Sequence, residues 1–163
     1  MKILGIDPGI ATTGYGFIEN KGSNLCLVDY GCIITSPKIS LPERLNTLFN
    51  ELSKLIKKQK PDEVAVEEIF FAKNVKTAMI VSQARGVILL SCLKSGMKVI
   101  NEYTPLEVKM ALVGYGRAEK QQVQKMVTTL LNLKEMPKPD DAADALAIAV
   151  CHFNSRVSNS YKQ

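Results

Sequence analysis

A strongly periodic segment at residues 41–56 separates two short apolar stretches, at residues 2–7 and 63–67. Its apolar residues recur every three or four positions, which is the spacing of one face of an α-helix. A helix that connects two strands of one sheet makes those strands parallel. The sequence therefore predicts an α/β fold in which the strand at residues 63–67 lies beside the strand at residues 2–7. The apolar residues of the predicted helix are Leu41, Leu45, Leu48, Phe49, Leu52, Leu55 and Ile56.

Two further strands come before this helix, and their short links favour an antiparallel meander with the first strand. Another strand and several helices follow the crossover. We therefore expect a mixed sheet of five strands, flanked by helices, in which the first three strands are antiparallel and the first is central. The additional strands are predicted at residues 14–19, 25–34 and 99–103, and the additional helices at residues 78–93, 105–112, 120–131 and 141–153.

The chain has 163 residues, which suits one domain with one sizeable core. It contains neither an internal repeat nor a linker that divides it. We expect residues 1–154 to form a single domain. Residues 155–163 are polar and are expected to form a flexible tail.

The net charge is +5 and the isoelectric point is about 9.0, which favours an anionic partner such as nucleic acid. We expect no apolar run that is long enough to cross a membrane. Asp7 interrupts the first apolar run too early for a signal peptide. These features predict a cytoplasmic protein without a membrane partner.

Acidic residues end both strands of the predicted parallel pair. Asp7 follows the first apolar stretch and Glu67 ends the later one, so both lie at the same edge of the sheet. Asp141 and Asp144 are three residues apart at the start of the last helix, which places them on one helix face. Four carboxylates repel one another unless a cation neutralises them, and Mg²⁺ prefers such oxygen ligands. Two such ions, roughly 3.5–4 Å apart, support phosphodiester hydrolysis.

Each acid also has an ordinary structural interpretation. Asp140 or Asp141 is a suitable helix cap, and only one of Glu67 and Glu68 can face the site because side chains alternate along a strand. The only histidine, His152, is interpreted as a structural or surface residue. With one histidine and no glycine-rich phosphate loop followed by lysine, neither a Ser-His-Asp triad nor a P-loop enzyme fits.

Motifs along the whole chain closely resemble the RuvC family of bacterial Holliday junction resolvases. The resemblance covers residues 1–153, and the combination of motifs is specific although the first alone is not. The matching segments are Gly5-Ile6-Asp7-Pro8-Gly9, Thr13-Gly14-Tyr15-Gly16, Ala65-Val66-Glu67, Phe71-Ala72-Lys73-Asn74, Gln83-Ala84-Arg85-Gly86, Val113-Gly114-Tyr115-Gly116, Ala118-Glu119-Lys120 and Asp141-Ala142-Ala143-Asp144-Ala145-Leu146-Ala147.

The resemblance implies an RNase H-like fold and a magnesium-dependent endonuclease, a crossover junction endodeoxyribonuclease, that resolves four-way DNA junctions in recombination and repair. It implies two Mg²⁺ ions, replaceable by Mn²⁺, on a catalytic set of Asp7, Glu67, Asp141 and Asp144. It further implies a homodimer, formed through the helix at residues 78–93, and a branch-migration motor as partner. The DNA contacts that it implies are Phe70, Lys73, Lys109 and Lys120, with Phe71 left open as an alternative to Phe70.

Other functions compete with this interpretation. Sugar kinases and actin-like ATPases also begin with a strand that ends in Gly-Ile-Asp, but this chain is too short for their two domains. A second alternative is a catalytically silent, RNase H-like module that only binds nucleic acid. The presence of all four acids argues against it, because such a module does not need them. The main alternative is an RNase H-like nuclease that acts on another branched DNA or on RNA.

Overall fold

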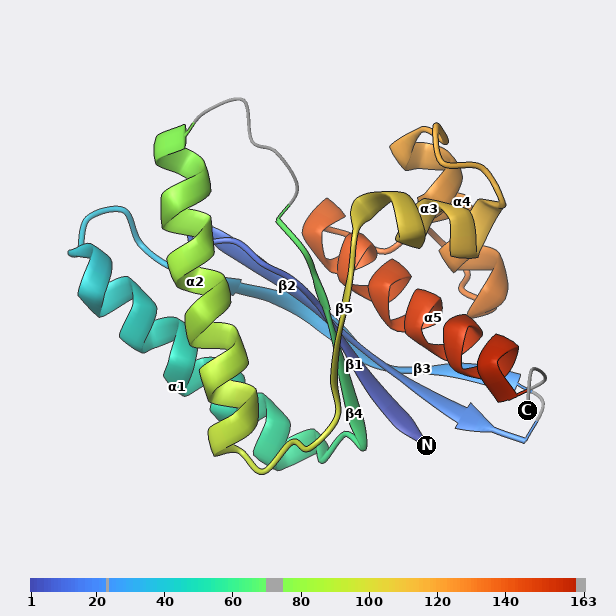
Figure 1. Cartoon of the computed structure of the whole chain (residues 1–163), viewed down its shortest axis with the longest axis horizontal. Coiled ribbons are helices and arrows are strands. Elements are labelled where there is room, and N and C mark those ends of the chain that lie inside the picture. Colours follow the sequence, from blue (N-terminus) through green and yellow to red (C-terminus); the bar gives the residue numbers. More distant parts are fainter. Residues whose placement is uncertain (23, 70–74, 161–163) are drawn as a thin grey trace.

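The computed structural model describes residues 1–22, 24–69 and 75–160, with the side chains of residues 158–160 left out. The chain folds into three layers, with α1 and α2 on one face of a central sheet and α3, α4 and α5 on the other (Figure 1). The elements are β1 (Lys2–Asp7), β2 (Thr12–Lys21), β3 (Asn24–Ile34), α1 (Leu41–Gln59), β4 (Glu63–Glu67), α2 (Val75–Lys94), β5 (Ile100–Tyr103), α3 (Pro105–Val113), α4 (Lys120–Leu130) and α5 (Asp140–Ser160).

The sheet has the strand order β3-β2-β1-β4-β5. β1 is central, and it pairs antiparallel with β2 and parallel with β4. This confirms the predicted mixed five-stranded sheet, including the antiparallel meander and the parallel crossover. α1 follows the predicted pattern and buries Leu48, Leu52 and Ile56 against the sheet.

Each face of the sheet has its own apolar core. Leu4 and Ile6 of β1 pack in the cluster beneath α1 and α2. Ile3 of the same strand and Ala65 of β4 pack in the cluster beneath α5. Since side chains alternate along a strand, odd-numbered positions of β1 and β4 face α5 and even-numbered positions face α1 and α2.

The last helix is longer than expected. α5 continues to Ser160, so residues 155–160 are helical and extend the last helix beyond the expected residue 153. The flexibility expected of residues 155–163 stays a prediction. Two contacts involve the extension: Ser155 donates to the Cys151 carbonyl at 2.9 Å, and Arg156 pairs with Glu63. The preceding Asn154 donates to the Ala111 carbonyl at 3.2 Å. Residues 161–163 lie outside the described part of the chain.

α2 meets the length and composition criteria for a membrane span, with a mean hydropathy of 1.3. The expectation that no apolar run reaches that length was therefore wrong. One face of the helix packs against α1 and the sheet. Ala84, Ile88 and Cys92 are buried against the sheet side, and Ser91 contacts Ser53 of α1 through their hydroxyl oxygens at 2.9 Å.

Candidate active site

Two of the predicted acids end neighbouring strands and face the same helix. Ile6 of β1 pairs with Val66 of β4, so Asp7 and Glu67 follow at adjacent positions. Both occupy the odd-numbered face of their strands, which is the face that α5 covers. The same alternation directs Glu68 toward the opposite face. The structure therefore favours Glu67 over Glu68 as the member of the site.

Close contact between α5 and the sheet brings the other two acids to this edge. A Cβ atom at Gly14 would overlap the carbonyl of Asp141, and one at Gly5 would overlap the carbonyl of Ala145. In the sheet Gly5 pairs with Gly16, and Asp7 pairs with Gly14. These residues without side chains let the helix lie directly on β1 and β2, so the N-terminal turn of α5 reaches Asp7.

The four acids form one electrostatic cluster. Burial raises the pKa of Asp7 to about 8, and the negative charges of Glu67, Asp144 and Asp141 add to this rise. Burial likewise raises the pKa of Glu67 to about 7, with a further contribution from Asp144. The pKa of Asp144 is also raised, first by burial. A bound cation would favour the ionised forms of Asp7 and Glu67, whose pKa values are raised in its absence.

Two lysines border the acids, as the resemblance implied. The Lys120 ammonium lies 2.7 Å from Asp144 and 3.5 Å from Asp140. Burial is the largest single influence and lowers the pKa of Lys120, but the hydrogen bonds and charges of Asp144 and Asp140 together outweigh it, so the net pKa is raised. The charges of Lys120 and Lys109 both lower the pKa of Glu67. A cavity of about 240 Å³ opens between these groups, lined by Glu67, Pro105, Val108, Lys109, Lys120, Val123, Asp144 and Ala147.

Asp140 and Asp141 take different places although they are adjacent. Asp140 accepts a hydrogen bond from the Gln124 amide at 3.2 Å, and its side chain is 66% exposed. The charge of Asp141 contributes to the raised pKa of Asp7. The structure therefore favours Asp141 as the inner residue. Phe70, Phe71 and Lys73 lie outside the described residues, so their predicted DNA contacts stay predictions.

The donor chemistry of the site suits a divalent cation. Four carboxylates supply hard oxygen ligands, and their mutual repulsion is the kind that a cation relieves. Within residues 1–22, 24–69 and 75–160, no three Asp, Glu, His or Cys side chains are close enough together to hold an ion as they stand. Asp144 is bonded to Lys120 in this arrangement. The residue types fit the cation, and binding requires their side chains to converge.

The sequence motifs contain Gly5, Gly14 and Gly16, but the motifs alone do not indicate that α5 contacts these glycines. The available signal was their pairing: once the first two strands are aligned antiparallel, Gly5 stands opposite Gly16. The alanine-rich first turns of α5 carry small side chains, which can pack closely on the surface that these glycines leave open.

The fold and this sheet edge define an RNase H-like α/β protein with a cluster of four carboxylates. The family model of the crossover junction endodeoxyribonuclease RuvC matches residues 3–152. The chain belongs to the RuvC family, which confirms the predicted family, fold class and enzyme class.

Curated relatives and solved structures agree with this assignment. The RuvC of Desulfitobacterium hafniense is 57% identical over 95% of this chain and 93% of its own length. The RuvC of Finegoldia magna is 54% identical over 94% and 93%, respectively. The Thermus thermophilus RuvC structure is 37% identical with a TM-score of 0.88, and 97% of each chain is covered. T. thermophilus RuvC in complex with Holliday junction substrate is 33% identical with a TM-score of 0.88, and covers 97% of this chain and 96% of the other.

Proposed function

We propose that this chain resolves four-way DNA junctions by metal-dependent phosphodiester hydrolysis in recombination and repair. The observation that carries the proposal is the coupled cluster of Asp7, Glu67, Asp141 and Asp144 at the edge formed by β1 and β4. The family and the junction complex of its T. thermophilus relative support the choice of substrate. Bacterial relatives and the basic charge favour action on DNA in the cytoplasm, without a membrane partner.

The four carboxylates are the residues that would hold Mg²⁺, or Mn²⁺ in its place. Two bound ions supply an activated water and stabilise the leaving oxygen of the phosphodiester. Asp7 would anchor the set from the end of β1, the central strand of the sheet. Asp144 approaches from α5, and Lys120 must leave it when the cation and the phosphate enter. Lys109 and Lys120 then provide positive charge for the phosphate.

A substrate panel tests this function. The protein is incubated with a labelled four-way junction, a linear duplex and an RNA–DNA hybrid, each with Mg²⁺ and with a chelator. We expect paired incisions in the junction, only with Mg²⁺. Preferential cutting of the hybrid, or of another branched DNA, would instead favour the alternative RNase H-like nuclease.

The raised pKa values predict a pH-dependent stabilisation by Mg²⁺. In the metal-free protein the folded pKa of Asp7 is about 8, against an ordinary value of 3.8, and that of Glu67 is about 7, against 4.5. Their favourable contribution is complete below about pH 4 and is lost as the pH rises through these folded values. Mg²⁺ pairs with the ionised forms, so it should raise the melting temperature more at pH 8 than at pH 5.5.

Thermal unfolding in Mg²⁺ and in chelator at both pH values checks this prediction. Asp7→Asn should reduce the Mg²⁺ effect at pH 8, and it should raise the melting temperature of the metal-free protein by about 3 °C because a buried charge is removed. Asp140→Asn is the control from the exposed neighbouring position. Equal Mg²⁺ effects at the two pH values would contradict the proposed role of these carboxylates.

The close seating of α5 predicts that Gly14→Ala lowers cleavage. The new methyl group would overlap the Asp141 carbonyl and displace the helix start, and a displacement of about 1 Å can cost on the order of 100-fold in rate. Junction cleavage and thermal unfolding should be measured together. Leu52→Ala is the control for lost stability alone, because Leu52 is buried under the opposite face of the sheet. Normal cleavage by Gly14→Ala would show that the helix start tolerates displacement.

Lys109→Ala and Lys120→Ala should each weaken DNA binding. If each lysine contacts one phosphate, each substitution lowers the slope of log affinity against log salt by about one. Binding titrations at several salt concentrations measure that slope, with Lys54→Ala, a lysine of α1 that pairs with Glu51, as control. An unchanged slope would leave both lysines as ordinary surface charges.

The proposal includes a homodimer formed through α2. Four large apolar side chains of this helix, Val75, Met79, Leu90 and Leu93, are between 47% and 71% exposed. Together with the exposed Gly86 they follow one another at steps of 4, 7, 4 and 3 residues, which places all five on one face of the helix. Such a stripe is the typical contact surface of a second helix, and a two-fold dimer presents two sites to a two-fold junction.

Two finer proposals rest on the family resemblance alone. Phe70 is proposed to stack on bases at the junction centre, and Lys73 is proposed to contact the DNA backbone. A branch-migration motor is the proposed protein partner.

A further inference from the structure

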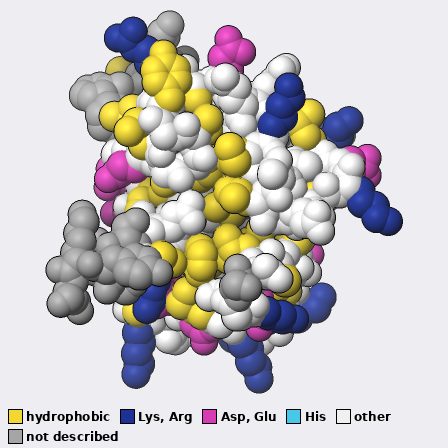
Figure 2. All heavy atoms as spheres, turned by 90° about the vertical axis from the view of Figure 1, so that its right-hand side faces the viewer, with side chains coloured by type: hydrophobic (Ala, Val, Ile, Leu, Met, Phe, Trp, Pro, Cys, Tyr) yellow, Lys and Arg dark blue, Asp and Glu magenta, His cyan; other side chains and the backbone are white. Residues whose placement is uncertain are grey.

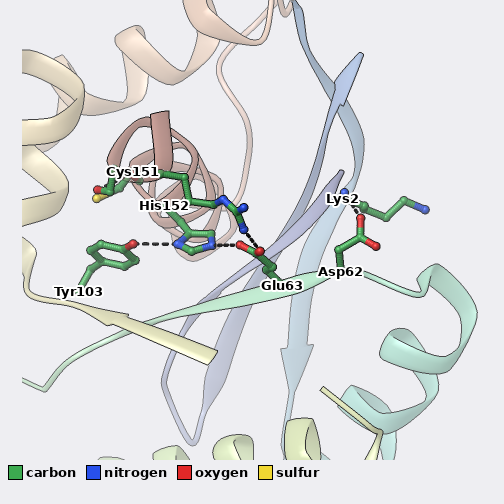
Figure 3. A network of polar contacts seen from close by, with 8 residues as sticks. Lys2, Asp62, Glu63, Tyr103, Cys151 and His152 are labelled. Carbon is green, nitrogen blue, oxygen red and sulfur yellow. Dashed lines mark hydrogen bonds and ion pairs between the residues drawn. The ribbon is translucent and has the colours of Figure 1, made fainter. Parts of the chain in front are cut away.

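A buried polar network joins α5 to β4 and β5 at a distance from the acids. The His152 ring is 2% exposed; its Nδ1 lies 2.7 Å from the Tyr103 hydroxyl and its Nε2 lies 2.6 Å from a Glu63 carboxylate oxygen. Arg156 pairs with the other oxygen of Glu63. Figure 3 shows His152 between Tyr103 on one side and Glu63 on the other. His152 is thus a buried structural residue.

One assignment of protons gives both ring nitrogens of His152 a hydrogen-bond partner. Burial lowers the pKa of His152, so a neutral ring is favoured at pH 7. A neutral ring has one donor and one acceptor. Nε2–H then donates to the Glu63 carboxylate, and Nδ1 accepts from the Tyr103 hydroxyl. The charges of Glu63 and Arg156 cancel, so the network is neutral and fully hydrogen-bonded, as a buried polar cluster requires.

The network and the acid cluster connect the same strand to the same helix at two points. Glu63 and Glu67 are both on the α5 face of β4, four residues apart, which is about 13 Å of strand. Asp144 and His152 are eight residues apart on α5, which is about 12 Å of helix. β4 runs toward the acid cluster and α5 runs away from it. The two spans match, so fixing Glu63 against His152 brings Glu67 level with Asp144.

The remaining contacts of α5 with the sheet are steric and apolar, and they set how closely the helix lies on β1 and β2. The closest approaches are made by Gly5 and Gly14 against helix backbone. Apolar contact depends on buried area and has no direction, whereas hydrogen bonds require specific distances and angles. At the N-terminal end of α5, the coupled carboxylates repel one another. An alignment favourable for metal binding therefore needs a directional contact elsewhere along the helix.

We propose that Glu63, His152 and Tyr103 are positioning residues that set the position of α5 along β4, so that Asp141 and Asp144 meet Asp7 and Glu67 at the distances a cation needs. The inference rests on the proposed metal site. The network lies about 13 Å of strand away from Glu67, the nearest proposed metal ligand on β4. Its loss should weaken metal binding and leave DNA contacts in place.

His152→Phe removes both hydrogen bonds of the ring and keeps an aromatic side chain of similar shape. We expect the Mg²⁺ concentration that gives half of the maximal thermal stabilisation, measured without DNA, to rise on the order of tenfold. Junction affinity in chelator should stay within about twofold of wild type, because phosphate contacts supply it. Cleavage should recover in large part at high Mg²⁺.

Two further variants keep the test decisive if His152→Phe folds poorly. Tyr103→Phe removes one hydroxyl, and Glu63→Gln removes the charge while keeping the shape; each should shift the Mg²⁺ midpoint in the same direction. Leu52→Ala is the control for destabilisation alone, because Leu52 is buried under the opposite face of the sheet. It should lower the melting temperature and leave the Mg²⁺ midpoint unchanged.

The outcomes separate this inference from the function on which it rests. If wild type is not stabilised by Mg²⁺, or Asp7→Asn is stabilised equally, the metal site is wrong and the inference falls with it. If wild type responds and Asp7→Asn does not, the metal site stands. An unchanged Mg²⁺ midpoint in His152→Phe, or in both milder variants, then shows that the network supports folding only and overturns the positioning role.

Discussion

Replacing any one of the four acids with its amide should lower junction cleavage on the order of 1,000-fold or more. Asp7→Asn, Glu67→Gln, Asp141→Asn and Asp144→Asn each remove a charge that neutralises the cation, and transition-state charge stabilisation is lost with it. Junction binding in chelator should stay within about threefold of wild type, because affinity comes mainly from lysine and arginine contacts to phosphates. Single-turnover cleavage and binding titrations measure the two effects separately.

Matched controls lie directly beside two of these residues. Glu68→Gln changes the neighbour that points to the opposite face of β4, and Asp140→Asn changes the exposed neighbour at the start of α5. Both should cleave within about threefold of wild type, as surface substitutions away from a site do. Near-normal cleavage by any of the four test variants would remove that residue from the catalytic set.

A charged residue in the exposed stripe of α2 should separate the dimer and weaken junction binding by about 100-fold. Leu90→Asp places a carboxylate at the proposed contact, where it would have to be buried without a partner. Two linked binding sites gain about 100-fold or more over one through effective concentration. Sedimentation at micromolar concentration and junction titrations measure both consequences.

Leu130→Asp is the matched control, because Leu130 is a similarly exposed leucine on α4. It should remain dimeric and bind junctions normally. A wild-type protein that is monomeric at micromolar concentration, or a Leu90→Asp variant that remains dimeric, would contradict the α2 interface.

The sheet and its edge could be predicted because local patterns specify them. The apolar spacing at residues 41–56 fixed the crossover, and the crossover brings Asp7 and Glu67 to one edge. The choice between Glu67 and Glu68 was not available from the sequence, since it depends on which face of β4 α5 covers. Once Ala65 is seen beneath α5, strand alternation decides it.

The end of the C-terminal helix could not be predicted from local sequence patterns. Residues 155–160 are polar and have no apolar stripe, so they were expected to be flexible. Arg156 is instead held by Glu63, which is 93 positions earlier in the sequence. His152 is buried for the same reason, through contacts with Glu63 and Tyr103. Such long-range polar pairs have no periodic signature and become visible only in the fold.

The distribution of charged and apolar side chains on the surface around α3, α4 and α5 could not be predicted from the sequence either. Hydrophobic side chains run across this face, and lysine and arginine side chains project from its edges (Figure 2). The net charge of +5 alone favoured an anionic partner without locating a contact surface. The structure gives Lys109 and Lys120 a specific place, beside Glu67 and Asp144.

The most direct test of the central claim is the location of bound Mn²⁺ by anomalous diffraction from crystals of this protein grown with the ion. The predicted result is density among the carboxylates of Asp7, Glu67, Asp141 and Asp144, with Lys120 displaced from Asp144, and loss of that density in Asp7→Asn. Mn²⁺ bound only elsewhere, with these four carboxylates and the bond from Lys120 to Asp144 unchanged, would contradict the account.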